Sequence, residues 1–288
     1  MTEQISLFDD IPNFPRQAFV PPVLGKDRAA LVRVAMDTME IMKHLDNRYK
    51  EAVLFKGNEP NNDASAYEQN GAGIVQVIDA DVLDVAEIFI GNNPCILNFG
   101  NAHNPGGGWL NGAIAQEECI ARRSSLIKSI GDNPMYLRNR AYTKTPYYLD
   151  DMIYSPRIRV LKDAQYNRLA KDEEFDVAVV TGAAVNMYST YIINNPDVVQ
   201  AQVDKTMERR IVKVLDIMAS YGHRCIVLGA WGCGAFGQDT YRVAEYFHKV
   251  LFEQGFAKCF DNIVFAIYND QPKIKVFEEV FAGKLFGE

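Results

Sequence analysis

The sequence predicts an α/β fold with a layered, substantially parallel sheet. Short apolar runs typical of buried strands recur along the 288 residues, and amphipathic stretches typical of helices separate them. Strands that alternate with helices favour a parallel sheet covered by helices. A content of 48% hydrophobic and 23% charged residues is ordinary for a globular protein. No repeat and no linker divides the chain, which favours one domain over two.

The first quarter of the chain is predicted to hold one helix between two irregular segments. Residues 1–23 are rich in proline and have few periodic apolar positions, which predicts an arm on the surface. Residues 57–73 are rich in Asn, Asp, Ser and Gly, which predicts a long exposed loop. Residues 27–49 have the period of an amphipathic helix, with periodic positions at Leu31, Val34, Ala35, Thr38, Met39 and Met42.

The remaining elements alternate between the two types. The predicted strands are residues 73–78, 94–99, 175–181, 224–229 and 262–267. The predicted helices are residues 82–90, 116–129, 200–221 and 240–253. Residues 133–154 are polar, weakly periodic and rich in tyrosine. We interpret these tyrosines as packing an insertion onto the sheet; the alternative is that they stack on a base or bind sugar hydroxyls.

Charge and composition exclude several classes of function. A formal net charge of −7 argues against a protein that holds duplex DNA by charge alone, because phosphate neutralisation needs a basic face. No apolar run approaches the ~18 residues of a membrane span, and residues 1–10 lack a signal-peptide core. The expected location is the cytoplasm.

Cysteine and histidine spacing argues against a metal site and against disulfides. The five cysteines are an odd number and no two have CxxC spacing, so we expect reduced thiols. The four histidines form no HExxH pattern. We therefore expect neither a protein-bound metal nor another cofactor.

The most informative motif is Asn104-Pro105-Gly106-Gly107-Gly108, which seven residues separate from Gln116-Glu117-Glu118. The apolar run at 94–99 precedes it. Three glycines allow positive φ and a close approach of backbone to ligand. The motif predicts a strand, a ligand-binding loop and then a helix that carries an acid. The alternative role of the two carboxylates is to stabilise the first turn of that helix through its dipole.

A second glycine-rich loop occupies residues 229–237 and also lies between a predicted strand and a predicted helix. Ligands of parallel sheets bind at the carboxyl ends of strands, where free N–H groups attract phosphate. Two such loops at one edge suit a diphosphate. Gly232, Gly234 and Gly237 satisfy GxGxxG, but no Walker lysine or ribose-binding acid accompanies them. Alternatively, these glycines only allow tight packing of strand on helix.

The GGG and QEE motif resembles the signature of poly(ADP-ribose) glycohydrolases, and its surroundings resemble the microbial-type branch. Further similarities are the residues Leu97-Asn98-Phe99, Asp151 to Pro156 and Gly234-Ala235-Phe236-Gly237. The resemblance implies a macrodomain-like three-layer α/β/α sandwich with a mixed, largely parallel sheet and an N-terminal helical extension. It also implies two parts in a single structural domain: an arm and helix at 1–50 packed on the core, and a glycohydrolase domain at 51–288.

The resemblance implies roles for particular residues. Glu118 matches the catalytic acid and base, and Glu117 matches the residue that holds ribose hydroxyls. Neighbouring helical residues diverge by about 100°, which agrees with separate roles. Phe236 is expected to pack against the distal sugar. The implied substrate-binding positions are Asn101 or Asn104, Gly106, Gly107, Gly108, Gln116, Gly232, Gly234, Ala235, Phe236 and Gly237.

The implied function is hydrolysis of ribose-ribose O-glycosidic bonds, mainly in exo mode, with ADP-ribose as product. Poly(ADP-ribose) or an ADP-ribosylated protein is the implied substrate, without duplex DNA, membrane or cofactor. In the microbial branch extra structure closes the cleft, and the residues before Tyr49 are candidates for it. Two alternatives remain open: a mono-ADP-ribosyl hydrolase, and a non-catalytic ADP-ribose-binding macrodomain.

Overall fold

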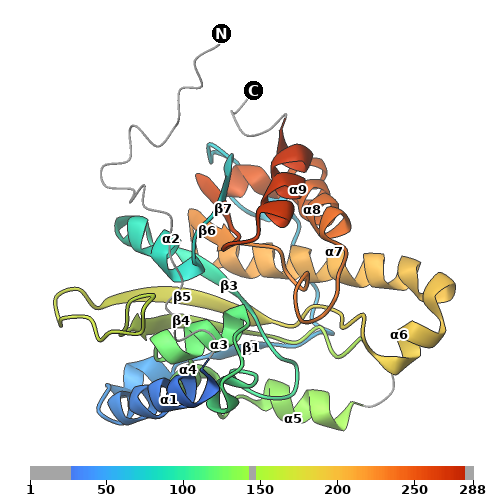
Figure 1. Ribbon diagram of the computed structural model, residues 1–288. Coiled ribbons are helices and arrows are strands. Elements are labelled where there is room, and N and C mark those ends of the chain that lie inside the picture. The colour runs from blue at the N-terminus through green and yellow to red at the C-terminus, as the bar shows by residue number, and fades with distance from the viewer. Residues whose placement is uncertain (1–26, 143–146, 283–288) are drawn as a thin grey trace.

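The computed structural model of the chain describes residues 27–142 and 147–282 (Figure 1). Its centre is a mixed sheet whose strands, among the described residues, have the order β1-β4-β5-β3-β6-β7-β2. All pairs from β5 to β2 are parallel, whereas β4 is antiparallel to both β1 and β5. The strands are β1 (Val53–Phe55), β2 (Ile74–Ile78), β3 (Cys95–Phe99), β4 (Met152–Val160), β5 (Phe175–Gly182), β6 (Cys225–Leu228) and β7 (Asn262–Ala266). The predicted α/β class with a largely parallel sheet is confirmed.

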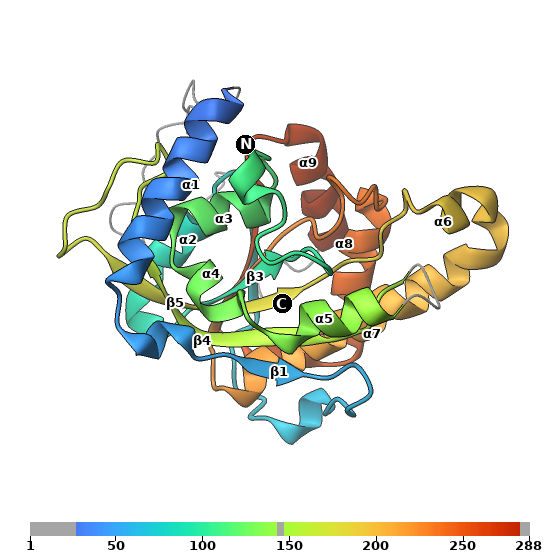
Figure 2. The same cartoon turned by 90° about the horizontal axis from the view of Figure 1, so that it is seen from below.

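Helices cover both faces of the sheet. They are α1 (Arg28–Lys43), α2 (Val82–Ile88), α3 (Gln116–Arg123), α4 (Leu126–Ile130), α5 (Pro134–Ala141), α6 (Thr190–Asn194), α7 (Pro196–Ser220), α8 (Thr240–His248) and α9 (Gln271–Phe281). A π-helical turn, Lys249–Glu253, extends α8. Figure 2 shows α2, α3 and α4 on one side of the sheet and α7, α8 and α9 on the other.

Alternation along the strands divides the core in two. In β3, Cys95 and Leu97 belong to the cluster formed with α7, α8 and α9, whereas Ile96 belongs to the cluster formed with α2, α3, α4 and α5. Successive side chains of a strand point to opposite faces, so a strand buried on both faces is apolar throughout. The result is the expected three-layer sandwich.

Helix α1 packs outside this sandwich, against α3. Its Thr38 hydroxyl donates to the carbonyl of Arg122 at 2.6 Å. The buried Lys162 ammonium donates to the same hydroxyl at 2.8 Å and to the carbonyl of Val34 at 3.0 Å. The side chain of Asp27 caps the helix by accepting from the N–H groups of Ala29 and Ala30. The predicted helix is therefore confirmed, and the predicted arm at 1–23 lies outside the described residues.

The antiparallel edge of the sheet differs from the sequence-based prediction, which contains neither β1 nor β4. β4 carries Pro156 and Arg157 in its interior, and its register against β5 shifts between Ser155 and Ile158. Such an irregularity removes the alternation that identifies a strand. The predicted helix at 116–129 is also divided, because Ser124 has an extended backbone between α3 and α4.

The tyrosine-rich segment is divided between helix and strand. Tyr136 on α5 and Tyr154 on β4 are only 2% and 3% exposed and belong to opposite cores. For these two residues the packing interpretation is confirmed.

Candidate active site

Gln116 fixes the start of α3 to the carboxyl end of β3. Its side-chain oxygen accepts from the N–H of Phe99 at 2.8 Å, and its amide donates to the carbonyl of Leu97 at 2.9 Å. The side-chain amide of Gln116 thus forms with β3 the kind of paired hydrogen bonds that a neighbouring strand would form. The two carboxylates that follow Gln116 are in this way directed at the loop after β3.

Glu117 is buried beneath that loop. Its carboxylate accepts from the backbone N–H of Asn101 at 2.6 Å and of Gly106 at 3.1 Å. Burial raises the pKa of Glu117 to about 8, against the lowering effect of the N–H donor of Asn101, while the neighbouring Glu118 adds to the rise. Glu117 therefore holds the loop through these two hydrogen bonds. Its raised pKa means that its carboxyl group gains and loses a proton close to neutral pH.

Glu118 lies against the glycine triplet. One carboxylate oxygen, Oε1, accepts from the N–H of Gly108 at 2.8 Å. The other, Oε2, is buried and has no hydrogen-bond partner among the described residues. Buried carboxylate oxygens are normally paired, so an unpaired one at a cavity is typical of a functional group that awaits a ligand or water.

Gly107 makes this approach possible. It has φ of +55°, and a Cβ on it would lie 2.4 Å from Oε1 of Glu118. Any other residue would strain the backbone and displace the carboxylate. Gly106, also at positive φ, would place a Cβ 2.5 Å from the side chain of Ile127. The triplet is thus fixed by the packing of α3 and α4 beneath it.

The second glycine loop forms the opposite wall. Gly232 has φ of +84°, and its carbonyl accepts from the N–H of Gln238 at 3.0 Å, which closes the loop. Within the described part of the chain, the N–H groups of Gly234, Ala235 and Phe236 donate to no acceptor. Consecutive free N–H groups ahead of a helix form an anion-binding site.

A cavity of about 460 Å³ lies between the two loops. Eight predicted site residues line it: Asn101, Gln116, Glu117, Glu118, Gly232, Gly234, Ala235 and Phe236. Gly106, Gly107, Gly108 and Gly237 are not among the lining residues, although the N–H groups of Gly106 and Gly108 donate to Glu117 and Glu118, which are. Asn104 is exposed and off the cavity, and its N–H donates to the side chain of Asn101. Of the two candidate asparagines, only Asn101 lies at the cavity.

The far end of the cavity contains residues that the sequence analysis does not identify. They are Asp81 after β2 and Tyr268, Asp270 and Lys273 after β7. Because β2 and β7 are parallel neighbours, their carboxyl ends meet the same edge as β3, and that rule is the signal that locates them. None of the described lining residues comes from α1, and the arm before it lies outside the described residues, so closure of the cleft by the residues before Tyr49 stays a prediction.

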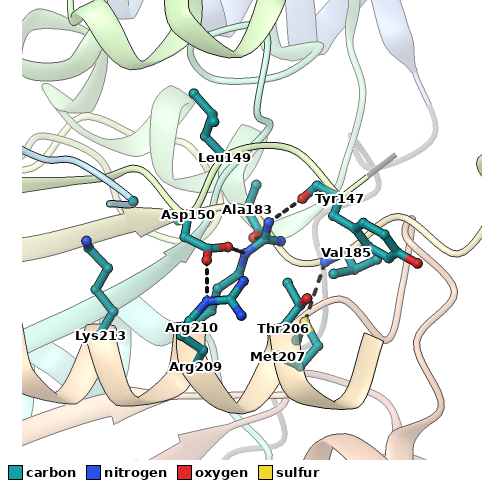
Figure 3. Close-up of polar contacts among 12 residues, drawn as sticks. Tyr147, Leu149, Asp150, Ala183, Val185, Thr206, Met207, Arg209, Arg210 and Lys213 are labelled. Carbon is teal, nitrogen blue, oxygen red and sulfur yellow. Dashed lines mark hydrogen bonds and ion pairs between the residues drawn. The ribbon is translucent and has the colours of Figure 1, made fainter. Parts of the chain in front are cut away.

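Behind the cavity, a buried arginine ties three segments together (Figure 3). Arg210 of α7 is 1% exposed and pairs with Asp150 at 2.7 Å. It also donates to the carbonyl of Ala183 at 2.9 Å and to that of Tyr147. Burial lowers the pKa of Arg210, and Asp150 opposes this. The pair fixes the segment before β4 to the end of β5, next to the cavity.

Within residues 27–142 and 147–282 the structure has no candidate metal site and no candidate membrane-spanning helix. No group of three or more His, Cys, Asp or Glu side chains is arranged to hold a metal ion. No helix there is long and apolar enough to cross a membrane.

Comparison with known proteins finds similarity in sequence and in structure. A model of the catalytic domain of microbial-type PARG matches residues 29–163. The poly(ADP-ribose) glycohydrolase of Thermomonospora curvata is 29% identical, with a TM-score of 0.77, over 88% of this chain and 100% of that chain. Its complex with the inhibitor ADP-HPD gives a TM-score of 0.76 at 29% identity, over 88% and 99% of the two chains.

The glycohydrolase of Deinococcus radiodurans in complex with ADP-ribose is 27% identical, with a TM-score of 0.74, over 83% of this chain and 97% of that chain. A search of curated proteins returns no match. The family model covers both the glycine triplet and the two glutamates, and the structural likeness extends over the whole sandwich. The chain is thus similar to microbial-type poly(ADP-ribose) glycohydrolases in the sequence of residues 29–163 and in its fold.

Proposed function

We propose that this chain hydrolyses the ribose-ribose O-glycosidic bonds of poly(ADP-ribose), with Glu118 as general acid and base. The observation that carries the proposal is the buried, unpaired Oε2 of Glu118 beside the glycine triplet in a cavity. The relatives crystallised with ADP-ribose and ADP-HPD support the ligand class. The match of residues 29–163 to the catalytic-domain model of microbial-type PARG supports the enzyme over a binding module.

In this proposal, different walls of the cavity bind different parts of the ligand. The free N–H groups at Gly234 to Phe236 suit the diphosphate, because backbone donors bind phosphate without needing a basic surface. The ring of Phe236 lines the cavity and offers a face to the distal ribose. Glu117 and Asn101 lie beside Glu118 and suit the ribose hydroxyls. The reacting sugar carbon is then held next to Glu118.

In the proposed reaction a protonated Glu118 gives its proton to the 2′ oxygen of the leaving unit. The bond between that oxygen and C1″ breaks as the sugar gains oxocarbenium character. The Glu118 carboxylate then takes a proton from water, whose oxygen forms the new bond to C1″. The proton on Glu118 is restored, and ADP-ribose is released from the polymer end.

Three further parts of the proposal concern mode, compartment and partners. Attack at the polymer end, mainly exo, is the mode that the similarity to microbial-type PARG implies. A cytoplasmic location is supported by five free cysteines. The net charge of −7 argues against duplex DNA as partner, and the relatives in complex with ADP-HPD and ADP-ribose support an ADP-ribose chain or an ADP-ribosylated protein.

The test compares Glu118→Gln with Glu87→Gln, which alters an exposed glutamate on α2. Glu118→Gln keeps the shape and the contact with Gly108 but has no proton to transfer. We expect release of ADP-ribose from poly(ADP-ribose) to fall about 10² to 10⁴-fold, and Glu87→Gln to equal the parent. Release at the parent rate by Glu118→Gln would refute the assignment.

In a parallel assay, the parent protein is incubated with mono-ADP-ribosylated protein in place of poly(ADP-ribose). Cleavage of the polymer alone supports the proposal. Cleavage of the mono-ADP-ribosylated protein alone, or binding of the polymer without release, contradicts it in favour of a mono-ADP-ribosyl hydrolase or a binding module.

A further inference from the structure

Exposed tyrosines lie outside the cavity, next to the second glycine loop. Tyr188 is 64% exposed and Tyr191, on α6, is 53% exposed. The turn that carries Tyr188 is fixed to the loop, because the N–H of Met187 donates to the carbonyl of Phe236 at 2.8 Å. The ring of Tyr188 lies against Gly237, where a Cβ would be 2.6 Å from its Cζ. The ring of Tyr188 therefore lies beside the loop that forms one wall of the cavity, and the exposed Tyr191 follows it three residues further along the chain.

A third tyrosine connects this surface to the first loop. The ring of Tyr148 lies 6.5 Å from that of Phe236 and 5.1 Å from that of His103, between their centroids. Tyr148 has φ of +63°, an unusual backbone conformation for a bulky residue. On either side, Tyr147 and Asp150 are held by Arg210 (Figure 3). We call Tyr148, Tyr188 and Tyr191 the tyrosine patch.

A cation lies at the edge of the patch. Arg140 is exposed, and its guanidinium donates to the carbonyl of His103. No carboxylate of the described residues forms an ion pair with it. A chain with a net charge of −7 thus presents an unpaired guanidinium beside aromatic rings. Aromatic rings together with arginine are the combination that binds single-stranded polynucleotides by stacking and charge.

We propose that the tyrosine patch and Arg140 bind a second ADP-ribose unit of the polymer, the one that leaves when the bond at Glu118 breaks. Its adenine stacks on Tyr188 and Tyr191, and its diphosphate meets Arg140. The inference rests on the proposed function, because the cavity must hold the terminal unit for the patch to face the next one. It makes the enzyme selective for polymer over ADP-ribose attached to other groups.

The test uses two substrates that differ only on the leaving side. One is a defined ADP-ribose oligomer, and the other is ADP-ribose joined through C1″ to 4-nitrophenol, which has no second unit. Tyr188→Ala/Tyr191→Ala is compared with Met36→Ala, which truncates a 57% exposed side chain on α1. We expect kcat/KM for the oligomer to fall about tenfold or more in the double variant, mainly through KM. Hydrolysis of the nitrophenyl substrate should match the parent.

The other outcomes overturn the inference separately from the proposed function. Oligomer hydrolysis equal to the parent, or an equal fall with both substrates, excludes a role for the patch in binding a second unit. Either result leaves the assignment of Glu118 standing. Failure of the parent protein to hydrolyse either substrate would instead refute the proposed function.

Discussion

At the scale of single residues, the site depends on two adjacent carboxylates with different surroundings. Both oxygens of Glu117 accept from backbone N–H groups of the loop, whereas Glu118 keeps one oxygen unpaired. Gly107 lets the loop approach Glu118 so closely that even a methyl group would displace the carboxylate. These contacts support the proposed division of roles, in which Glu117 holds the loop and the ribose and Glu118 transfers the proton.

Glu117 should make stability depend on pH. Its pKa is about 8 in the folded chain against an ordinary value of 4.5, so between these values only the folded state holds the proton. The free energy of unfolding therefore falls as pH rises through this window, by at most about 1.4 kcal/mol per unit, and is level above it. Urea unfolding from pH 5 to pH 9 measures this slope.

The matched variant for this slope is Glu117→Gln, which cannot titrate. The difference in unfolding free energy between parent and variant should shift in favour of the variant as pH rises from 5 to 8. A difference that stays constant over this range would show that the pKa of Glu117 is not raised.

At the scale of elements, Arg210 connects α7 to two segments that the sheet alone does not hold together. Arg210→Met leaves the carbonyls of Ala183 and Tyr147 without this donor and leaves Asp150 paired only with the half-exposed Arg209. Breaking a buried pair from one side costs about 3–5 kcal/mol. We expect a loss of that order in the free energy of unfolding, measured in urea.

Lys249→Met is the control for Arg210. Lys249 pairs with Glu208 at 2.8 Å with its side chain 45% exposed, and such surface pairs contribute about 0–1 kcal/mol. Equal losses in the two variants would mean that the buried arginine does not act as a connector.

The sequence predicts the elements whose hydrophobic pattern is local. Among the described parallel strands, β3, β5 and β6 are largely apolar runs because both of their faces are buried, and α8 has a strong helical period. β1 has three residues and β4 has a bulge around Pro156, so their pairing depends on distant partners.

The same limit applies to the site. Its first half lies in one stretch after β3, which makes it recognisable as a motif. Asp81 and Tyr268 reach the cavity from separate strands and form no motif together. Asp81 also has an ordinary local role, because it caps α2 through the N–H of Leu83. Only the pairing of β2 with β7 brings the two residues together.

At the scale of the whole molecule, the division between residues 1–50 and 51–288 in one structural domain stays a proposal. Its support is the docking of α1, which places Met42 in a cluster with Trp109 and Ala121. The buried Lys162 depends on α1 for the hydroxyl of Thr38 and the carbonyl of Val34. Undocking α1 would break these hydrogen bonds and the ion pair of Lys162 with Asp37 and would expose the apolar cluster, so we expect α1 and the sandwich to unfold together.

The two tryptophans of the chain test this cooperativity, because each reports on one part. Trp109 is 3% exposed at the α1 interface, and Trp231 is fully buried in the main core. Trp231→Phe leaves fluorescence from the α1 interface alone, and Trp109→Phe leaves it from the core alone. Within each variant we expect the fluorescence and far-UV circular dichroism transitions in urea to coincide, as two-state unfolding requires. If the fluorescence of Trp109 changes at lower urea than the circular dichroism of the same variant, the helix undocks before the sandwich unfolds, and the single-domain proposal is wrong.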